Sequence, residues 1–253
     1  LVMKQRLESN SLKLVANNQG YQIRGEVKIN GQSAALDYRK PAGNADADVR
    51  VTATLDDASR ARFGIDLGSA ATGNIPLKLN GKIGSGDRDS RFGIEADLSG
   101  LRIDNILPGW IKTPGRSAKA TFNVVRKEQS TRFEDVLIEG GGALIKGVVE
   151  VDDKGDLMLA SFPTYQPGES DRASLRAERM PDGVLKISMR GDLFDGRGFI
   201  KSAVGGSSPD KSKQKLADFD LDLKFGAIAG HNGEALRALD VKLTRRNGII
   251  RNF

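Results

Sequence analysis

Strict alternation of apolar and charged residues is the feature that most constrains how this chain can fold. The alternation is clearest in residues 217–225, ADFDLDLKF, where every odd position is apolar and every even position is charged. Because the side chains of a β-strand point alternately to its two faces, this segment predicts a strand with one dry and one solvated face. The same pattern recurs at 21–29, 49–55, 75–83, 92–98, 118–124, 157–159, 185–189 and 239–243. The sequence therefore predicts an all-β protein.

Turn signals separate these segments. Asn-Gly or Asp-Gly pairs stand at 30–31, 80–81, 182–183, 195–196 and 247–248, and residues 153–155 read Asp-Lys-Gly. Such pairs favour the type I′ turn of a tight hairpin, so we expect sequential strands to pair antiparallel. The three glycines at 140–142 run directly into another apolar segment and predict a bulge or a turn. We expect roughly fourteen short strands, each with one apolar face.

A sheet of that size has to curve. The predicted fold is a large curved antiparallel β-sheet, groove-like or open-barrel-like, with one or two short helices. Closure into a barrel, folding into a sandwich and curvature into an open groove all satisfy the alternation. Residues 56–68 predict a short helix that is capped by Asp56 or Asp57 and carries Ala58, Ala61 and Phe63. Residues 101–116, with the only tryptophan, predict a connector packed on an edge or end of the sheet.

The chain is expected to have three parts. Residues 1–201 form the curved sheet and residues 216–253 continue it. Between them, residues 202–215 are rich in Gly, Ser and Lys and show no periodicity, which predicts a flexible polar loop. The chain starts at Leu1 and ends inside an expected strand, so we interpret it as part of a longer protein.

Composition excludes several kinds of site. Without cysteine the chain has no disulfide, thiolate metal ligand, iron–sulfur cluster or thiol nucleophile. No apolar stretch approaches the roughly 18 residues that span a bilayer, and the first ten residues lack the pattern of a signal peptide. The net charge of +6 is spread along the chain without a basic block, so no nucleic-acid partner is expected. A preference for anionic lipid surfaces fits the same charge.

No catalytic constellation is assembled in the sequence. His231 is the only histidine, it lies in a turn-like segment, and no nucleophile-elbow motif accompanies it. Asp218, Asp220 and Asp222 fall on one strand face and not around a loop, so we interpret them as solvated residues. The chain is predicted not to be an enzyme and to use no cofactor or metal. A carbohydrate-active enzyme with two converging carboxylates is the least favoured alternative.

Four segments carry a resemblance to a known family: 54–83 (TLDDASRARFGIDLGSAATGNIPLKLNGKI), 97–115 (DLSGLRIDNILPGWIKTPG), 193–200 (LFDGRGFI) and 220–251 (DLDLKFGAIAGHNGEALRALDVKLTRRNGIIR). Their order resembles the AsmA-like proteins of the proteobacterial envelope, of the YhdP and TamB type, over most of residues 21–253. The resemblance implies a periplasmic segment of a protein anchored in the inner membrane, whose sheet curls into an apolar groove and takes part in phospholipid transport and outer-membrane homeostasis. The implied partners are phospholipid or another apolar ligand and other envelope proteins. Membrane association would come from other parts of the parent chain.

The predicted lipid-contacting residues are apolar positions of the alternating segments, because acyl chains need apolar shielding and no polar specificity. They are Phe122, Val124, Leu185, Ile187, Phe219, Leu221, Leu223 and Phe225. A second interpretation makes the same residues the closed core of a structural or protein-interaction domain of the cell envelope, with no ligand. A large open apolar face would distinguish the first interpretation from the second.

Overall fold

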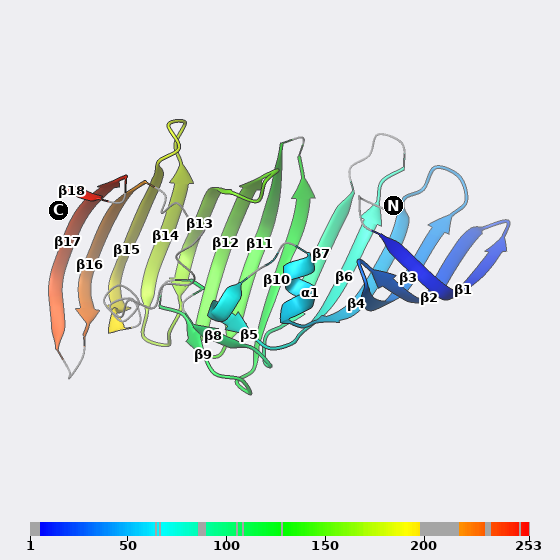
Figure 1. The fold of residues 1–253 in the computed structure, drawn as a ribbon, viewed down its shortest axis with the longest axis horizontal. Helices are drawn as coiled ribbons and strands as arrows, with labels where there is room; N and C mark the ends of the chain where they lie inside the picture. Colours follow the sequence, from blue (N-terminus) through cyan, green and yellow to red (C-terminus); the bar gives the residue numbers. More distant parts are fainter. Residues whose placement is uncertain are drawn as a thin grey trace.

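The computed structural model describes residues 6–63, 65, 67–85, 90–104, 106–107, 109–127, 129–197, 218–230, 234–247 and 249–252. The protein is all-β, as the alternation predicts. Fifteen strands of the described residues form one large sheet, and three short strands form a second one. The large sheet extends along the long axis of the molecule, from the N-terminal strand at one end to the C-terminal strand at the other (Figure 1).

The strands of the large sheet lie side by side in chain order. They are β1 (Leu7–Asn17), β2 (Gly20–Ile29), β3 (Gln32–Pro41), β4 (Ala47–Leu55), β6 (Ile75–Ile83), β7 (Arg91–Asp97), β10 (Ala118–Arg126), β11 (Ser130–Gly140), β12 (Ala143–Asp152), β13 (Leu157–Gln166), β14 (Arg172–Arg179), β15 (Leu185–Asp195), β16 (Phe219–Ala229), β17 (Ala235–Arg246) and β18 (Ile249–Asn252). The second sheet contains β5 (Ala71–Thr72), β8 (Arg102–Asp104) and β9 (Ile111–Lys112). The helix α1 (Asp57–Arg62) and the 3₁₀ turn η1 (Gly68–Ala70) precede β5.

Tight turns explain why successive strands become neighbours. Asn30 and Gly31, between β2 and β3, have φ angles of 49° and 82°. This is the left-handed region that both central residues of a type I′ turn require. Gly155 and Gly183 also have positive φ, and residues 140–142 form the turn that joins β11 to β12. The turns predicted at these positions are confirmed.

The turn predicted at Asn80-Gly81 is wrong, because both residues lie inside β6. Asn80 pairs with Gly93 of β7, and Gly81 pairs with Phe92. The Phe92 ring occupies the place of a side chain at position 81, since a Cβ built on Gly81 would lie 2.4 Å from Phe92 Cδ1. This glycine therefore allows a close approach between strands and forms no turn.

One pair of neighbouring strands departs from the expected antiparallel order. β15 and β16 are parallel, with Leu185 opposite Phe219 and Asp195 opposite Ala229. Parallel neighbours need a crossover of about a dozen residues or more, and the chain between Asp195 and Phe219 is long enough to provide one. The pair Asp195-Gly196 therefore ends a strand without forming a hairpin. Residues 202–215, the predicted flexible loop, lie outside the described residues.

The helix α1 begins where the sequence predicts a helix. The Ser59 N–H donates a hydrogen bond of 2.7 Å to Asp56 Oδ1, which caps the first turn. Polar residues anchor the helix, because Ser59 and Arg60 are buried whereas Ala58 and Ala61 are exposed. The Arg60 guanidinium donates to a carbonyl of β5 and to the carbonyl of the residue after β5. A buried arginine thus joins α1 to the second sheet.

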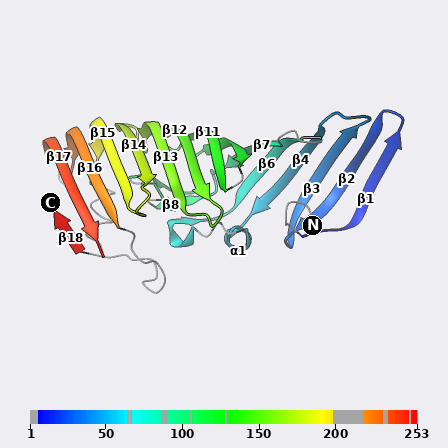
Figure 2. The ribbon, with the colours of Figure 1, turned by 90° about the horizontal axis from the view of Figure 1, so that it is seen from above.

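Both α1 and the second sheet lie on one face of the large sheet. Figure 2 shows α1 and β8 to one side of the long strands. We call this side the inner face and the opposite side the outer face. Two clusters of buried apolar residues lie on the inner face, one under the second sheet around Trp110 and one across β12–β16 around Tyr165. The core of the protein therefore lies on the inner face of the large sheet.

We predict that Gly81→Ala lowers the free energy of unfolding by about 1–3 kcal/mol, because the new Cβ has to displace the Phe92 ring and the Arg91 carbonyl. Gly93→Ala is the matched control on the neighbouring strand, since its Cβ would first meet the Asn123 side chain at 3.3 Å. The control should change stability by less than about 0.5 kcal/mol. Urea unfolding followed by circular dichroism measures both variants. Equal losses of stability in the two variants would contradict the conclusion that Gly81 allows the two strands to approach closely.

Candidate apolar binding face

Unbroken rows of apolar residues cross the large sheet on its inner face. Directly paired residues of neighbouring strands point to the same face, so a row can be followed from strand to strand. One row passes from β1 to β17 through Leu14, Ile23, Tyr38, Val49, Gly81, Phe92, Val124, Phe133, Val149, Ala160, Ala177, Ile187, Leu221 and Leu243. No charged side chain interrupts this row.

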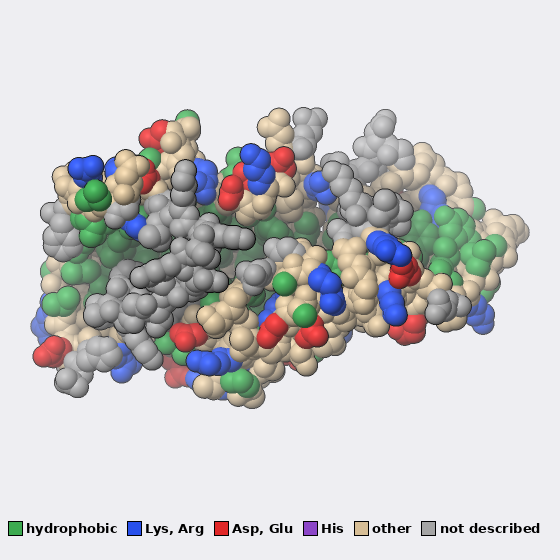
Figure 3. All heavy atoms as spheres, viewed as in Figure 1, with side chains coloured by type: hydrophobic (Ala, Val, Ile, Leu, Met, Phe, Trp, Pro, Cys, Tyr) green, Lys and Arg blue, Asp and Glu red, His purple; other side chains and the backbone are tan. Residues whose placement is uncertain are grey.

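A second apolar row runs beside the first. It passes from β2 to β17 through Val27, Ala34, Ala53, Leu77, Ala96, Ala120, Ile138, Ile145, Tyr165, Ala173, Gly191, Phe225 and Leu239. Because the rows cross the strands, they follow the long axis of the sheet. Figure 3 shows apolar side chains in the hollowed middle of this face, between two rims that carry Lys, Arg, Asp and Glu.

The eight predicted lipid-contacting residues all lie on the inner face, but in two separate places. The first group is Leu185, Ile187, Phe219, Leu221, Leu223 and Phe225 on β15 and β16, and the second is Phe122 and Val124 on β10. The parallel pairing of β15 with β16 brings the first group together, for example by setting Ile187 beside Leu221. Four strands, β11–β14, separate the two groups. Phe225 is buried and the other seven residues are half-buried.

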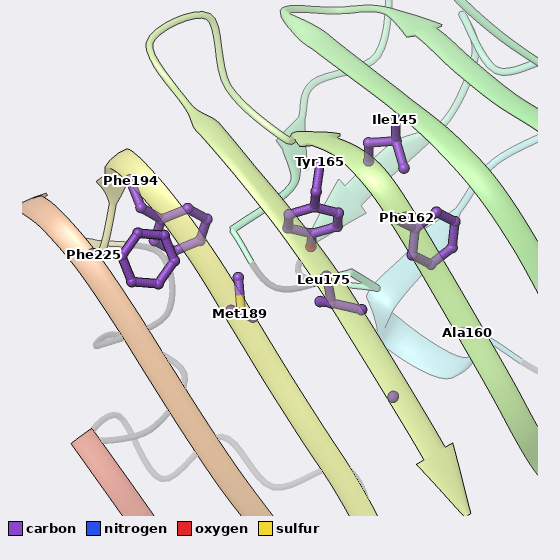
Figure 4. Close-up of a cluster of buried hydrophobic side chains, with 9 residues drawn as sticks. Ile145, Ala160, Phe162, Tyr165, Leu175, Met189, Phe194 and Phe225 are labelled. Atoms are coloured by element: carbon purple, nitrogen blue, oxygen red, sulfur yellow. The ribbon is translucent and has the colours of Figure 1, made fainter. Parts of the chain in front are cut away.

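The C-terminal half of the inner face is closely packed. Figure 4 shows Phe194 and Phe225 side by side, and their ring centroids are 5.3 Å apart. Tyr165 is fully buried, which raises the pKa of its phenol above the usual value. Burial also raises the pKa of Asp171, whose Oδ1 accepts a hydrogen bond of 2.7 Å from the Asp195 N–H. This half has the packing of a protein core.

The second sheet covers the middle of the inner face. Trp110 is 3% exposed and packs with buried alanines of β7, β10 and β12. Lys112 of β9 is 1% exposed, and its ammonium donates to the carbonyls of Ser99, Leu101 and Thr113 at 3.1, 2.9 and 3.2 Å. Burial lowers the pKa of Lys112, because the charged form loses its hydration. A buried lysine therefore ties this cover to the loops around it.

The N-terminal end of the inner face is open to solvent. Leu12, Leu14 and Tyr21 are 45%, 62% and 40% exposed, and Figure 3 shows apolar side chains at this end of the molecule. Large apolar side chains gathered in one exposed area are typical of a binding surface. The strand β1 was not predicted, although Leu12, Leu14 and Ala16 repeat with the two-residue period that predicted other strands.

The outer face is polar and carries ion pairs between directly opposed residues. Lys78 faces Glu95 with a nitrogen–oxygen distance of 3.4 Å, and Lys119 faces Glu139 at 2.8 Å. The hydrogen bond to Glu139 raises the pKa of Lys119. Exposed pairs of this kind contribute about 0–1 kcal/mol each. They keep this face solvated, while the apolar rows on the inner face stabilise the fold.

Two of the acidic residues considered as metal ligands, Asp220 and Asp222, lie in outer-face ion pairs. Arg190 binds the Asp222 carboxylate at 2.6 Å, and this hydrogen bond lowers the pKa of Asp222. Arg246 binds Asp220 at 2.7 Å. Within the described ranges, no group of three His, Asp or Glu residues is placed to hold a metal ion. His231 lies outside the described residues.

The inner face thus has an open N-terminal end, a covered middle and a packed C-terminal half. No helix in the part of the chain that the structure describes is long and apolar enough to cross a membrane. Comparison of the chain with protein-family models, curated proteins and solved structures finds no match. Its function is therefore inferred from the geometry of the inner face.

We predict that Lys112→Met lowers the free energy of unfolding by about 1–3 kcal/mol, because it leaves buried carbonyls without a donor. Lys146→Met is the control, since Lys146 is exposed on β12, and it should change stability by less than about 0.5 kcal/mol. Urea unfolding, followed through the fluorescence of the only tryptophan, measures both. Unchanged stability of Lys112→Met would mean that the lysine does not hold the cover in place.

Proposed function

We propose that this chain binds the acyl chains of phospholipid along its inner face and serves lipid transport in the cell envelope. The open N-terminal end is the observation that carries the proposal. Leu14, at 62% exposure, belongs to the same apolar row as Ile187 and Leu221 of the packed half. Apolar residues that only formed a core would be covered at this end as well, whereas Leu12, Leu14 and Tyr21 of β1 and β2 are exposed.

The size and chemistry of the inner face support a lipid ligand. Removing an acyl chain from water gains about 0.8 kcal/mol per CH₂, and this gain needs apolar surface but no specific polar group. Neighbouring strands lie about 4.8 Å apart, so the rows extend on the order of 70 Å across the large sheet. The hydrocarbon core of a bilayer is about 30 Å thick. At the open N-terminal end, acyl chains would lie along the rows, with the charged rims beside the headgroups (Figure 3).

The resemblance to AsmA-like envelope proteins supports a location of this lipid-binding activity in the bacterial envelope. In the proposal the chain is a periplasmic segment of a protein anchored in the inner membrane through other parts of the parent chain. It shields acyl chains on their way between the membranes and thereby contributes to outer-membrane homeostasis. It acts without catalysis, and other envelope proteins are its candidate protein partners.

A second candidate function is that of a structural or protein-interaction domain without a ligand. The packed half favours it, because Phe225 and Tyr165 are buried as in an ordinary core. The two functions differ in what they require of the open end. A lipid-binding protein needs the exposed apolar side chains of β1 and β2 as a contact surface, whereas a structural domain needs only the core.

Two neighbouring residues of β1 provide the sharpest test. Leu14 and Val15 are 62% and 50% exposed and point to opposite faces of the same strand. We predict that Leu14→Asp weakens phospholipid binding about tenfold or more, because burying one leucine contributes about 1.5–3 kcal/mol. Val15→Asp introduces the same charge on the outer face and should bind as the unmodified chain does.

The measurement is native mass spectrometry after incubation with vesicles of phosphatidylethanolamine and phosphatidylglycerol. Retained phospholipid that is reduced in Leu14→Asp but kept in Val15→Asp supports the proposal. If the unmodified chain shows only the mass of the protein without lipid, the structural domain would be favoured. The same holds if both variants lose bound lipid to an equal extent. Urea unfolding of each variant checks that both remain folded.

A further inference from the structure

The outer face contains a hollow that the proposed lipid function does not use. Its volume is about 1270 Å³, and it lies over β4, β6, β7, β10 and the start of β11. Alternate residues of these strands point into it from the outer face, among them Arg50, Asn80 and Asn123. Gly93 lies at the floor of the hollow and has no side chain to fill it. The hollow is therefore a feature of the polar side of the sheet.

Basic side chains predominate around this hollow. The charged lining residues on the outer face are Arg50, Lys82, Arg91, Lys127, Asp48, Glu134 and Asp135. Two of the acids are engaged, since Glu134 pairs with Arg132 at 3.1 Å and Asp135 accepts a hydrogen bond of 3.0 Å from Asn123. Lys127 pairs with Glu150. Within the described part of the chain, no ion pair engages Lys82, Arg91 or Arg50.

Two of these unpaired cations face each other. Lys82 of β6 and Arg91 of β7 are directly opposed across the strand pair. Like charges in this position destabilise a sheet, whereas opposite charges stabilise it. The same two strands use the favourable arrangement elsewhere, where Lys78 faces Glu95 at 3.4 Å. Asp48 of β4 faces Lys82 from the other side, so a single acid stands against two cations at this point of the hollow.

We propose that this hollow binds an anionic ligand that carries two or more phosphate or carboxylate groups. One group would lie between Lys82 and Arg91 and neutralise their repulsion, and another would lie near Arg50. Arginine and lysine bind such groups by charge-assisted hydrogen bonds. The Asn80 and Asn123 amides supply neutral polar groups in the same lining. The volume exceeds that of a single phosphate group, which is why a multiply charged ligand is proposed.

Arg91→Glu tests the site without disturbing the fold, because Glu at 91 would face Lys82 as Glu95 faces Lys78. Lys13→Glu is the matched control. It makes the same change of charge on the same face, opposite Arg24 at the far end of the sheet. The probe is sodium tripolyphosphate, titrated by isothermal calorimetry into the whole chain at near-physiological salt. Thermal unfolding of each variant is measured in parallel.

The expected result is saturable binding that Arg91→Glu weakens about tenfold or more and Lys13→Glu leaves unchanged. Arg91→Glu should keep or raise the unfolding temperature in the absence of the probe. Absence of binding by the unmodified chain would overturn the proposal. Equal weakening in the two variants would also overturn it, because it would show attraction by net charge and not by this hollow.

Discussion

Every strand of the large sheet has to present its apolar residues to the same face as its neighbours, because a slip of one residue would turn them all to water. The register meets this condition from β1 to β17. It does so even where the pairing is irregular, as between β10 and β11, where a shift lies between Thr121 and Asn123. Ala120 still faces Ile138 on one side of the shift and Val124 faces Phe133 on the other. The apolar rows therefore survive the bulge.

The same rows play different roles along their length because they are covered unequally. Under the second sheet they form a core that contains Trp110, and across β12–β16 they pack on each other around Tyr165. At β1 and β2 their side chains meet solvent. A protein that only needed stability would gain by covering this end as well, since exposed apolar area costs free energy and favours aggregation. The uncovered end is therefore the part of the fold that most needs a functional explanation.

The sequence predicted the all-β fold and the single apolar face of the sheet through its alternation, because a period of two follows directly from strand geometry, and several turns through its Asn-Gly and Asp-Gly pairs. It failed where a residue acts through a distant neighbour. Gly81 looked like part of a turn, but its role depends on the ring of Phe92 on the next strand. The parallel order of β15 and β16 depends on a long connection and not on a local signal.

The placement of the candidate site was only partly predictable for the same reason. Alternation indicated correctly that Phe122 and Leu221 share a face, but sequence cannot tell how many strands separate them. It also cannot tell which stretch of the face is covered. That depends on tertiary contacts such as the hydrogen bonds from Lys112 to three carbonyls, which hold the cover over the middle of the face. Leu14, at the N-terminal end, is 62% exposed.

The proposed function requires that the inner face, and not the outer one, receives apolar ligands. Photolabelling with a diazirine-bearing phospholipid, followed by residue-level mass spectrometry, measures which face is in contact with lipid. We expect labels on alternate residues of the open end, such as Leu12, Leu14 and Ile23, and none on Lys13 and Arg24 between them. Labels on both faces alike, or no labelling of β1 and β2, would contradict the proposed function.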